Sequence, residues 1–214
     1  MHDAKGYKFF SFSNVLPPKD LDRGSNRYLI LASPDRDMMS TFADGIDSII
    51  RRGLPIRIGE MEFVVEDCLV LDTHLDDDWV VLRSGTPIVV RIPKKNYAEY
   101  GIRPAKDYKY LYWRSSFPLQ AFLKQLEDNL LKKYGTYHDK EIESTAIFQG
   151  FRFLKQVSNR VRIREKEHIL IGSLWEFRFG QLDNKIRNVL QFGMDAGFGE
   201  MNSLGFGFMN KLTQ

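Results

Sequence analysis

Glycine is concentrated near the end of the chain, where backbone without side chains could bind an anion. Five of the 16 glycines fall within residues 193–207, namely Gly193, Gly197, Gly199, Gly205 and Gly207. Such backbone can adopt positive φ and direct several N–H groups at one phosphate. It also permits a tight turn in which a helix and a strand pack closely, and the glycines alone leave both interpretations open. Asn202 and Asn210 stand at the third-glycine positions of a dinucleotide fingerprint, and no Gly-Lys-Ser/Thr follows, so the two familiar phosphate motifs are excluded.

A run of basic residues precedes the glycines and could contact phosphates. It contains Arg152, Lys155, Arg160, Arg162, Arg164 and Lys166. Residues 160, 162 and 164 alternate with Val161 and Ile163, so in a strand the three arginines project from one side. Guanidinium groups match phosphate oxygens and the grooves of a short RNA stem, and Arg152 and Lys155 extend the predicted surface. The alternative is a solvated face of a β-hairpin.

Other candidate residues favour ordinary structural roles. His74 with Asp76, Asp77 and Asp78 could imitate a metal site, but an acidic loop between domains is the simpler interpretation. Cys68 lies in an apolar run and is predicted to be a buried thiol. No pattern predicts a resident metal ion or cofactor.

The composition is that of a globular protein with a mild basic excess. The chain has 214 residues, 43% of them hydrophobic, and a formal net charge of +3. One cysteine excludes an intramolecular disulfide and a Cys-rich zinc site. It favours a reducing compartment, and no stretch of 18 apolar residues or signal-like leader is evident, so we expect a cytoplasmic protein without a membrane partner.

The elements that must position these residues form two groups. In the first, strands are expected over 7–13, 27–33 and 62–71, with a helix that begins at Ser33-Pro34-Asp35, where Ser33 is the expected N-cap, and ends at Gly53. In the second, strands are expected over 79–83, 88–92, 151–157, 169–179 and 204–209, with helices over 118–134 and 184–192. The main elements of the second group have the βαββαβ order of a ferredoxin-like unit, an antiparallel sheet with two helices on one face.

The predicted fold is therefore α+β, with two ferredoxin-like domains in tandem. Residues 1–75 would form an incomplete N-terminal domain that lacks its opening strand and helix, which leaves a core face uncovered. Residues 76–214 would form the C-terminal domain that carries the glycine-rich loop.

The stretch from Gly197 to Gly207, Gly-Phe-Gly-Glu-Met-Asn-Ser-Leu-Gly-Phe-Gly, resembles the C-terminal signature of the sixth CRISPR-associated protein family. The segment His2-Asp-Ala-Lys-Gly-Tyr-Lys8-Phe-Phe-Ser-Phe-Ser is similar to the part of that family that leads into its second strand. These proteins are endoribonucleases of the RAMP superfamily that cut CRISPR repeat RNA, and they have tandem ferredoxin-like domains.

The resemblance implies a metal-independent nuclease reaction. A ribose 2′-OH attacks the adjacent phosphate and leaves a 2′,3′-cyclic phosphate and a 5′-OH. His2 stands where the family places its histidine, an acid–base group, and Lys8 where it places a lysine that stabilises the transition state. The family's tyrosine belongs to a helix that precedes residue 1, and it has no counterpart in this sequence.

The resemblance also assigns RNA binding to the glycine-rich stretch, through Gly197, Gly199, Ser203, Gly205 and Gly207, beside the basic run. The expected partner is CRISPR repeat RNA in its precursor form, and other Cas proteins or a second copy of the chain are further candidates. Two alternatives to a nuclease remain: a paralogue that binds the repeat without cutting it, and a structural RAMP subunit of an effector complex.

Overall fold

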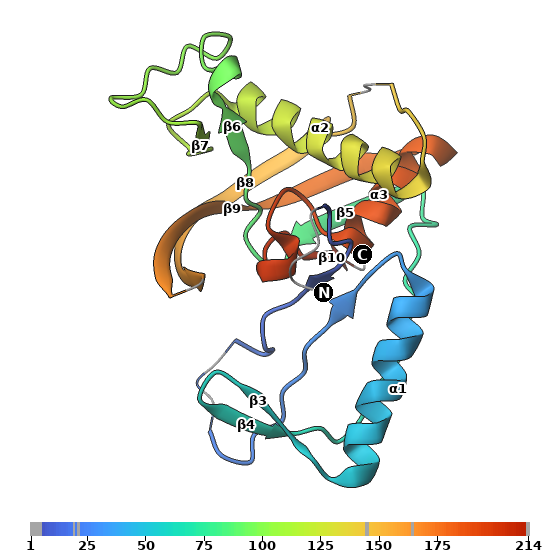
Figure 1. The fold of residues 1–214 in the computed structure, drawn as a ribbon. Helices are drawn as coiled ribbons and strands as arrows, with labels where there is room; N and C mark the ends of the chain where they lie inside the picture. The colour runs from blue at the N-terminus through green and yellow to red at the C-terminus, as the bar shows by residue number, and fades with distance from the viewer. Residues whose placement is uncertain (1–5, 19, 21, 144–145, 164, 213–214) are drawn as a thin grey trace.

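The computed structural model describes residues 6–18, 20, 22–143, 146–163 and 165–212 (Figure 1). His2 and Arg164, two of the predicted site residues, lie outside these ranges.

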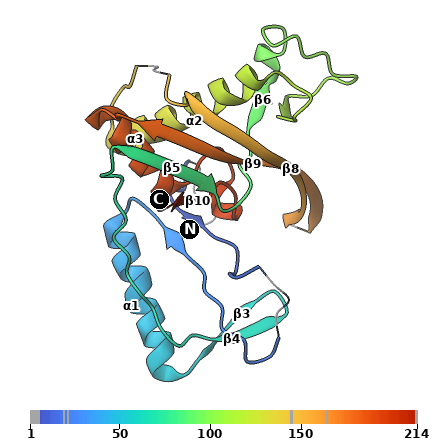
Figure 2. The same ribbon diagram turned by 180° about the vertical axis from the view of Figure 1, so that it is seen from behind.

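The C-terminal part is built on a four-stranded antiparallel sheet with the order β10-β5-β9-β8. Its elements follow along the chain as β5 (Trp79–Ser84), α2 (Leu119–His138), β8 (Gly150–Ile163), β9 (Lys166–Gly180), α3 (Asn184–Ala196) and β10 (Met209–Leu212). This βαββαβ arrangement, with the first and third strands in the middle, confirms the predicted ferredoxin-like order. Helices α2 and α3 lie on one face of the sheet, and Figure 2 shows the other face open.

The hydrophobic core lies between this sheet and its helices. Strand residues alternate, so Val80 and Leu82 of β5 face inward with Trp175 and Phe177 of β9, all buried. The ring of Trp175 stacks on Phe122 of α2 at a centroid distance of 4.4 Å. This packing fixes the sheet against α2 and leaves Arg83 of β5 and Glu176 and Arg178 of β9 on the opposite face.

Two features extend from the C-terminal sheet. Between β5 and α2 the chain forms a small sheet of β6 (Arg91–Pro93) and β7 (Tyr110–Tyr112), with the 3₁₀ helix η1 (Lys94–Asn96) after β6. Strands β8 and β9 continue as a long curled hairpin (Figure 1) whose register shifts once, between Phe153 and Lys155.

The N-terminal part has the expected order of strand, strand, helix and strand, with one additional strand. The elements are β1 (Ser11–Phe12), β2 (Leu31–Ala32), α1 (Arg36–Arg52), β3 (Pro55–Ile58) and β4 (Met61–Val64). β1 pairs with β2 and β3 with β4, both antiparallel. Gly53 ends α1 in the left-handed conformation, as predicted.

Much apolar surface of this N-terminal part is exposed. No residue of α1 is buried. The exposed large apolar side chains are Leu29, Phe42, Leu54, Ile58, Met61, Val64, Leu69, Val70 and Leu71. The N-terminal elements therefore leave many apolar side chains exposed to solvent.

The boundaries of several N-terminal elements differ from the sequence-based expectation. Asp35, not Ser33, caps α1, because its carboxylate accepts the N–H of Met38 at 2.9 Å while the Ser33 hydroxyl donates to the Phe9 carbonyl. The expected strand over 62–71 ends at Val64. Cys68 therefore follows the sheet in an irregular segment and is partly exposed, so its assignment to the core was wrong.

The last strand begins later than expected. Residues 202–204 form the 3₁₀ helix η2 (Asn202–Leu204), and Gly205 and Gly207 both have positive φ, which a strand does not accommodate. β10 therefore starts at Met209 instead of residue 204. No helix among the described residues is long and apolar enough to cross a bilayer.

Candidate nucleic-acid interface

The glycine-rich segment, residues 197–207, folds back on itself next to α2. Five of its residues have positive φ: Gly197, Gly199, Met201, Gly205 and Gly207. A Cβ on Gly199 would lie 2.5 Å from the carbonyl oxygen of Val89, and a Cβ on Gly207 would overlap the carbonyl oxygen of Phe198. At these two positions glycine is required by both the backbone conformation and the closeness of neighbouring backbone.

A buried lysine from α2 holds the segment in place. The Nζ of Lys133 donates to the carbonyl oxygens of Gly197 and Gly199, at 2.5 and 3.1 Å, and to Oδ1 of Asn202 at 3.0 Å. Asn202 in turn donates through Nδ2 to the carbonyl oxygens of Phe198 and Phe206. Burial lowers the pKa of Lys133 to about 7, and the nearby carboxylate of Glu200 acts in the opposite direction.

Some of the backbone donors that could have bound an anion are used inside the protein. The N–H of Gly205 donates to the Asn202 carbonyl, and the N–H of Gly207 donates to the Pro87 carbonyl, each at 2.9 Å. Around Gly205 and Gly207 the backbone therefore forms a tightly packed turn, and these two N–H groups are not available to an anion. Ser203 and Gly205 are partly exposed, whereas Gly197, Gly199 and Gly207 are buried.

The N-terminal segment runs along the glycine-rich segment, although the two are far apart in sequence. The Ser11 hydroxyl donates to the Asp195 carbonyl at 3.3 Å, and the ring of Phe12 lies 3.0 Å from where a Cβ on Gly205 would be. Burial and the charge of Glu200 raise the pKa of Tyr7. Lys8 is partly buried and lies three residues before β1, which contacts α3 through Ser11 and the glycine-rich segment through Phe12.

The arginines of the β8–β9 hairpin alternate as predicted but do not face the glycine-rich segment. Val161 packs on Phe206 and the neighbouring cluster, whereas Arg160 and Arg162 are exposed. Because strand side chains alternate, the two arginines project from the opposite side of the hairpin. Arg160 and Arg162 form a basic edge on the side of the hairpin that faces away from Phe206.

Arg152 and Lys155 lie on a third surface. The bulge after Phe153 changes the alternation, so Arg152 is paired with Glu176 and Lys155 with Leu174, two positions apart on β9. Both basic side chains therefore emerge on the face of the sheet opposite α2 and α3.

The sequence did not single out an ion-pair cluster at the edge of the glycine-rich segment. Glu200 accepts from the backbone N–H of Arg91 at 3.0 Å and from its Nε at 2.5 Å. The Arg91 guanidinium lies over the ring of Tyr110, 4.7 Å from the centroid. Burial, and after it the side-chain hydrogen bond between Tyr112 and Tyr110, raises the pKa of Tyr112 to about 12. The cluster offers aromatic rings beside a guanidinium, groups that suit nucleotide bases.

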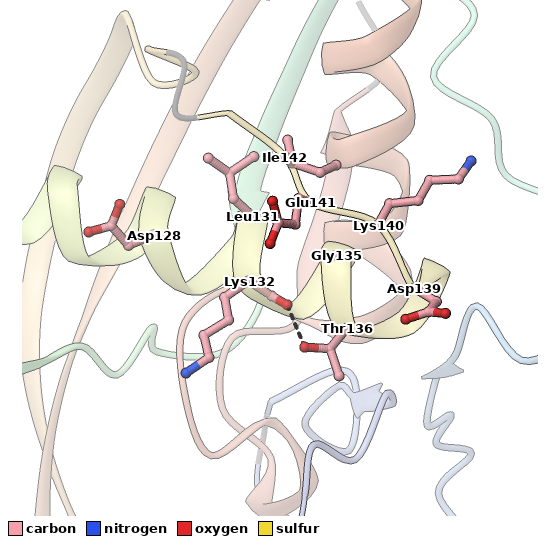
Figure 3. A pocket seen from close by; sticks show the side chains of 9 residues that line it. All are labelled: Asp128, Leu131, Lys132, Gly135, Thr136, Asp139, Lys140, Glu141 and Ile142. Carbon is pink, nitrogen blue, oxygen red and sulfur yellow. Dashed lines mark hydrogen bonds between the residues drawn. The ribbon is translucent and has the colours of Figure 1, made fainter.

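The described residues contain no group of three or more His, Cys, Asp or Glu side chains arranged to hold a metal ion. His74 instead pairs with Asp72 at 2.9 Å, and both are exposed. A hollow of about 570 Å³ lies beside the C-terminal half of α2 (Figure 3), but none of the predicted site residues lines it.

Comparison with known protein families gives one match over most of the chain. The family described as "CRISPR associated protein Cas6, C-terminal" matches residues 72–211. This range contains the four-stranded sheet, its helices and the glycine-rich segment.

Two similar relatives are named as nucleases. "CRISPR-associated endoribonuclease Cas6 2" of Methanocaldococcus jannaschii is 27% identical over 99% of this chain and 84% of its own length. "CRISPR-associated endoribonuclease Cas6" of Haloferax mediterranei is 29% identical over 98% of this chain and 78% of its own length.

Solved structures show the same fold. A structure titled "CRISPR associated protein Cas6" has a TM-score of 0.68 at 23% identity and covers 99% of this chain and 82% of that one. A protein titled "Characterization of a Cas6-related gene from Pyrococcus furiosus" has a TM-score of 0.66 at 20% identity, covering 96% of this chain and 79% of that one. The fold class predicted from the sequence, with ferredoxin-like units in tandem, is confirmed, whereas the domain boundaries at residues 75 and 76 stay a prediction.

Proposed function

The chain belongs to the Cas6 C-terminal family, and on that premise we propose that it binds CRISPR repeat RNA and cleaves it. The names of the two relatives, both endoribonucleases aligned over nearly the whole chain, support this assignment.

The observation that carries the proposal is the contact between two segments far apart in sequence. The segment that holds Lys8 packs along residues 195–205, through Ser11 and Phe12. Two parts of the sequence that share a family resemblance thereby meet in space. A ribonucleotide chain bound over the glycine-rich segment would pass close to Lys8.

The proposed reaction needs no external reactant. The ribose 2′-oxygen forms a bond to the adjacent phosphorus as the bond to the 5′-oxygen breaks. The 2′ proton passes to a base, and an acid supplies a proton to the leaving oxygen. We assign the acid–base role to His2 and the stabilisation of the phosphorane charge to Lys8.

The basic edge of the hairpin supplies the second part of the proposal. Arg160 and Arg162 are exposed and lie side by side on one face of a long protruding hairpin, a shape that suits the groove of an RNA stem. We propose that this edge binds the repeat at a distance from the cleaved bond, with Arg164 in the same role.

The test is cleavage of a CRISPR repeat RNA by the full chain in EDTA. The expected products end in a 2′,3′-cyclic phosphate and a 5′-OH. Lys8→Ala should lower the single-turnover rate by about 100-fold or more, the usual size for one lost donor at the transition-state charge, with little change in RNA affinity. Lys185→Ala, an exposed lysine at the start of α3, is the matched control. Tight retention of uncut RNA by the unaltered chain would identify a binding paralogue and refute the nuclease assignment.

A further inference from the structure

Three arginines converge on one carboxylate on the open face of the sheet, the face opposite α2 and α3. The Glu176 side chain is only 3% exposed. Its Oε2 accepts from Arg83 at 2.6 Å and from Arg152 at 2.8 Å. Its Oε1 accepts from Arg178 at 2.9 Å, so the carboxylate is saturated by guanidinium groups from three strands.

The register places these groups in a compact array. Arg83 of β5, Glu176 of β9 and Arg152 of β8 form one row across the sheet. Arg178 lies two residues further along β9. Trp79 is on the same face of β5, and its indole covers Gly180, where a Cβ would be 2.5 Å from the ring.

The array has more positive charge than its carboxylate neutralises. Hydrogen bonds from the three arginines hold the pKa of Glu176 at about 2, so at neutral pH one negative charge faces three positive ones. The arginine side chains remain 44%, 56% and 64% exposed. Guanidinium groups have five N–H donors each, so donors remain for a further anion, and the shared carboxylate fixes their orientation before it binds.

The surroundings have room and an aromatic surface for a ligand. A depression of about 540 Å³ is lined by the three arginines together with Trp79 and Leu212. Trp79 is 64% exposed, although tryptophan is usually mostly buried. A fixed cationic array beside an exposed indole combines phosphate binding with base stacking.

We propose that this array, Trp79 with Arg83, Arg152 and Arg178, binds an unpaired segment of RNA, with phosphates on the guanidinium groups and a base on the indole. The inference rests on the RNA-binding half of the proposed function and assigns it an additional surface, separate from Lys8 and the glycine-rich segment. An acidic polypeptide would satisfy the arginines but would leave the stacking surface of Trp79 without a role, so we favour RNA.

The experiment measures binding of a labelled 12-nucleotide oligouridylate to the full chain over a range of salt concentrations. Arg178→Gln leaves Glu176 with two arginines, so no buried charge is orphaned. This variant should reduce the log–log salt slope by about 0.7, the value for one phosphate contact on a single strand. Trp79→Ala should weaken binding roughly 5- to 100-fold. Arg103→Gln, an exposed arginine outside the array, is the control and should bind as the unaltered chain does.

Tryptophan fluorescence gives an independent readout. Trp113 and Trp175 are 4% and 1% exposed, so quenching by the oligonucleotide should report on Trp79 and vanish in Trp79→Ala. Unchanged binding by both variants, with repeat RNA still cleaved, would overturn the array and leave the proposed function standing. If the unaltered chain does not cleave repeat RNA, but its binding of oligouridylate still depends on Arg178, the proposed nuclease function would be overturned and the array would stand. If a hexaglutamate peptide competes fully with the oligonucleotide and Trp79→Ala does not change oligonucleotide binding, the assignment of RNA as the ligand would be overturned in favour of an acidic protein partner.

Discussion

Replacement of Lys133 by methionine tests how the glycine-rich segment is held. Methionine keeps most of the side-chain volume but donates no hydrogen bond. The change leaves three buried acceptors without their donor, on Gly197, Gly199 and Asn202. Each unsatisfied buried acceptor costs about 1–3 kcal/mol, and some of this is offset because a buried ammonium group no longer has to be desolvated.

We therefore expect Lys133→Met to lower the free energy of unfolding by about 3 kcal/mol. For a chain of this size that corresponds to a fall in Tm of roughly 6–12 °C. Thermal unfolding followed by circular dichroism measures it, and the affinity for repeat RNA should fall with it, because the segment loses its attachment to α2.

Lys132→Met is the matched control, since Lys132 is adjacent in α2 but exposed. Its Tm should stay within about 2 °C of that of the unaltered protein. A Lys133→Met variant as stable as the Lys132→Met variant would show that the three hydrogen bonds do not hold the segment.

Three further predictions concern Asp195, Gly199 and Arg162. Burial raises the pKa of Asp195 to about 6 from 3.8. The folded state therefore holds a proton that the unfolded state has lost, and stability falls as pH rises through this window. Asp195→Asn should remove that loss and stabilise the protein by about 1–3 kcal/mol at pH 8 but little at pH 4, in paired thermal melts. Gly199→Val places a branched side chain against the Val89 carbonyl and should lower Tm by more than 5 °C, whereas Gly45→Ala, in open space on α1, should raise it slightly; equal effects would contradict the packing. Arg162→Ala should lower the salt slope for repeat RNA by about 0.7–0.9, and an unchanged slope would remove the hairpin edge from the interface.

The C-terminal fold could be predicted because its elements carry strong local patterns. Alternation in β5 and β9 and the apolar stripe of α2 fixed the element types, and the order of elements then indicated the ferredoxin-like unit. The residues at which elements end could not be predicted as well as the element types. Residues 65–71 have the apolar, β-branched composition of a strand, yet a strand also needs a partner, and among the described residues they are not assigned to any sheet.

The candidate site could be predicted only in part, for a related reason. The glycines and alternating arginines are visible in the sequence, but whether they share a surface depends on the path of the hairpin. Lys133 carried a signal that was not used, since it continues the apolar stripe of Leu126 and Leu130 at helical spacing. Glu176 and its arginines come from three strands, so only the register of the sheet brings them together.

A repeat RNA with a single 2′-deoxynucleotide at the cleaved position tests the nuclease assignment most directly. If the 2′-oxygen is the nucleophile, this RNA should bind with the affinity of the all-ribose repeat and remain intact in EDTA while the all-ribose repeat is cut. Cleavage of the deoxy-substituted RNA at the same bond would contradict the account.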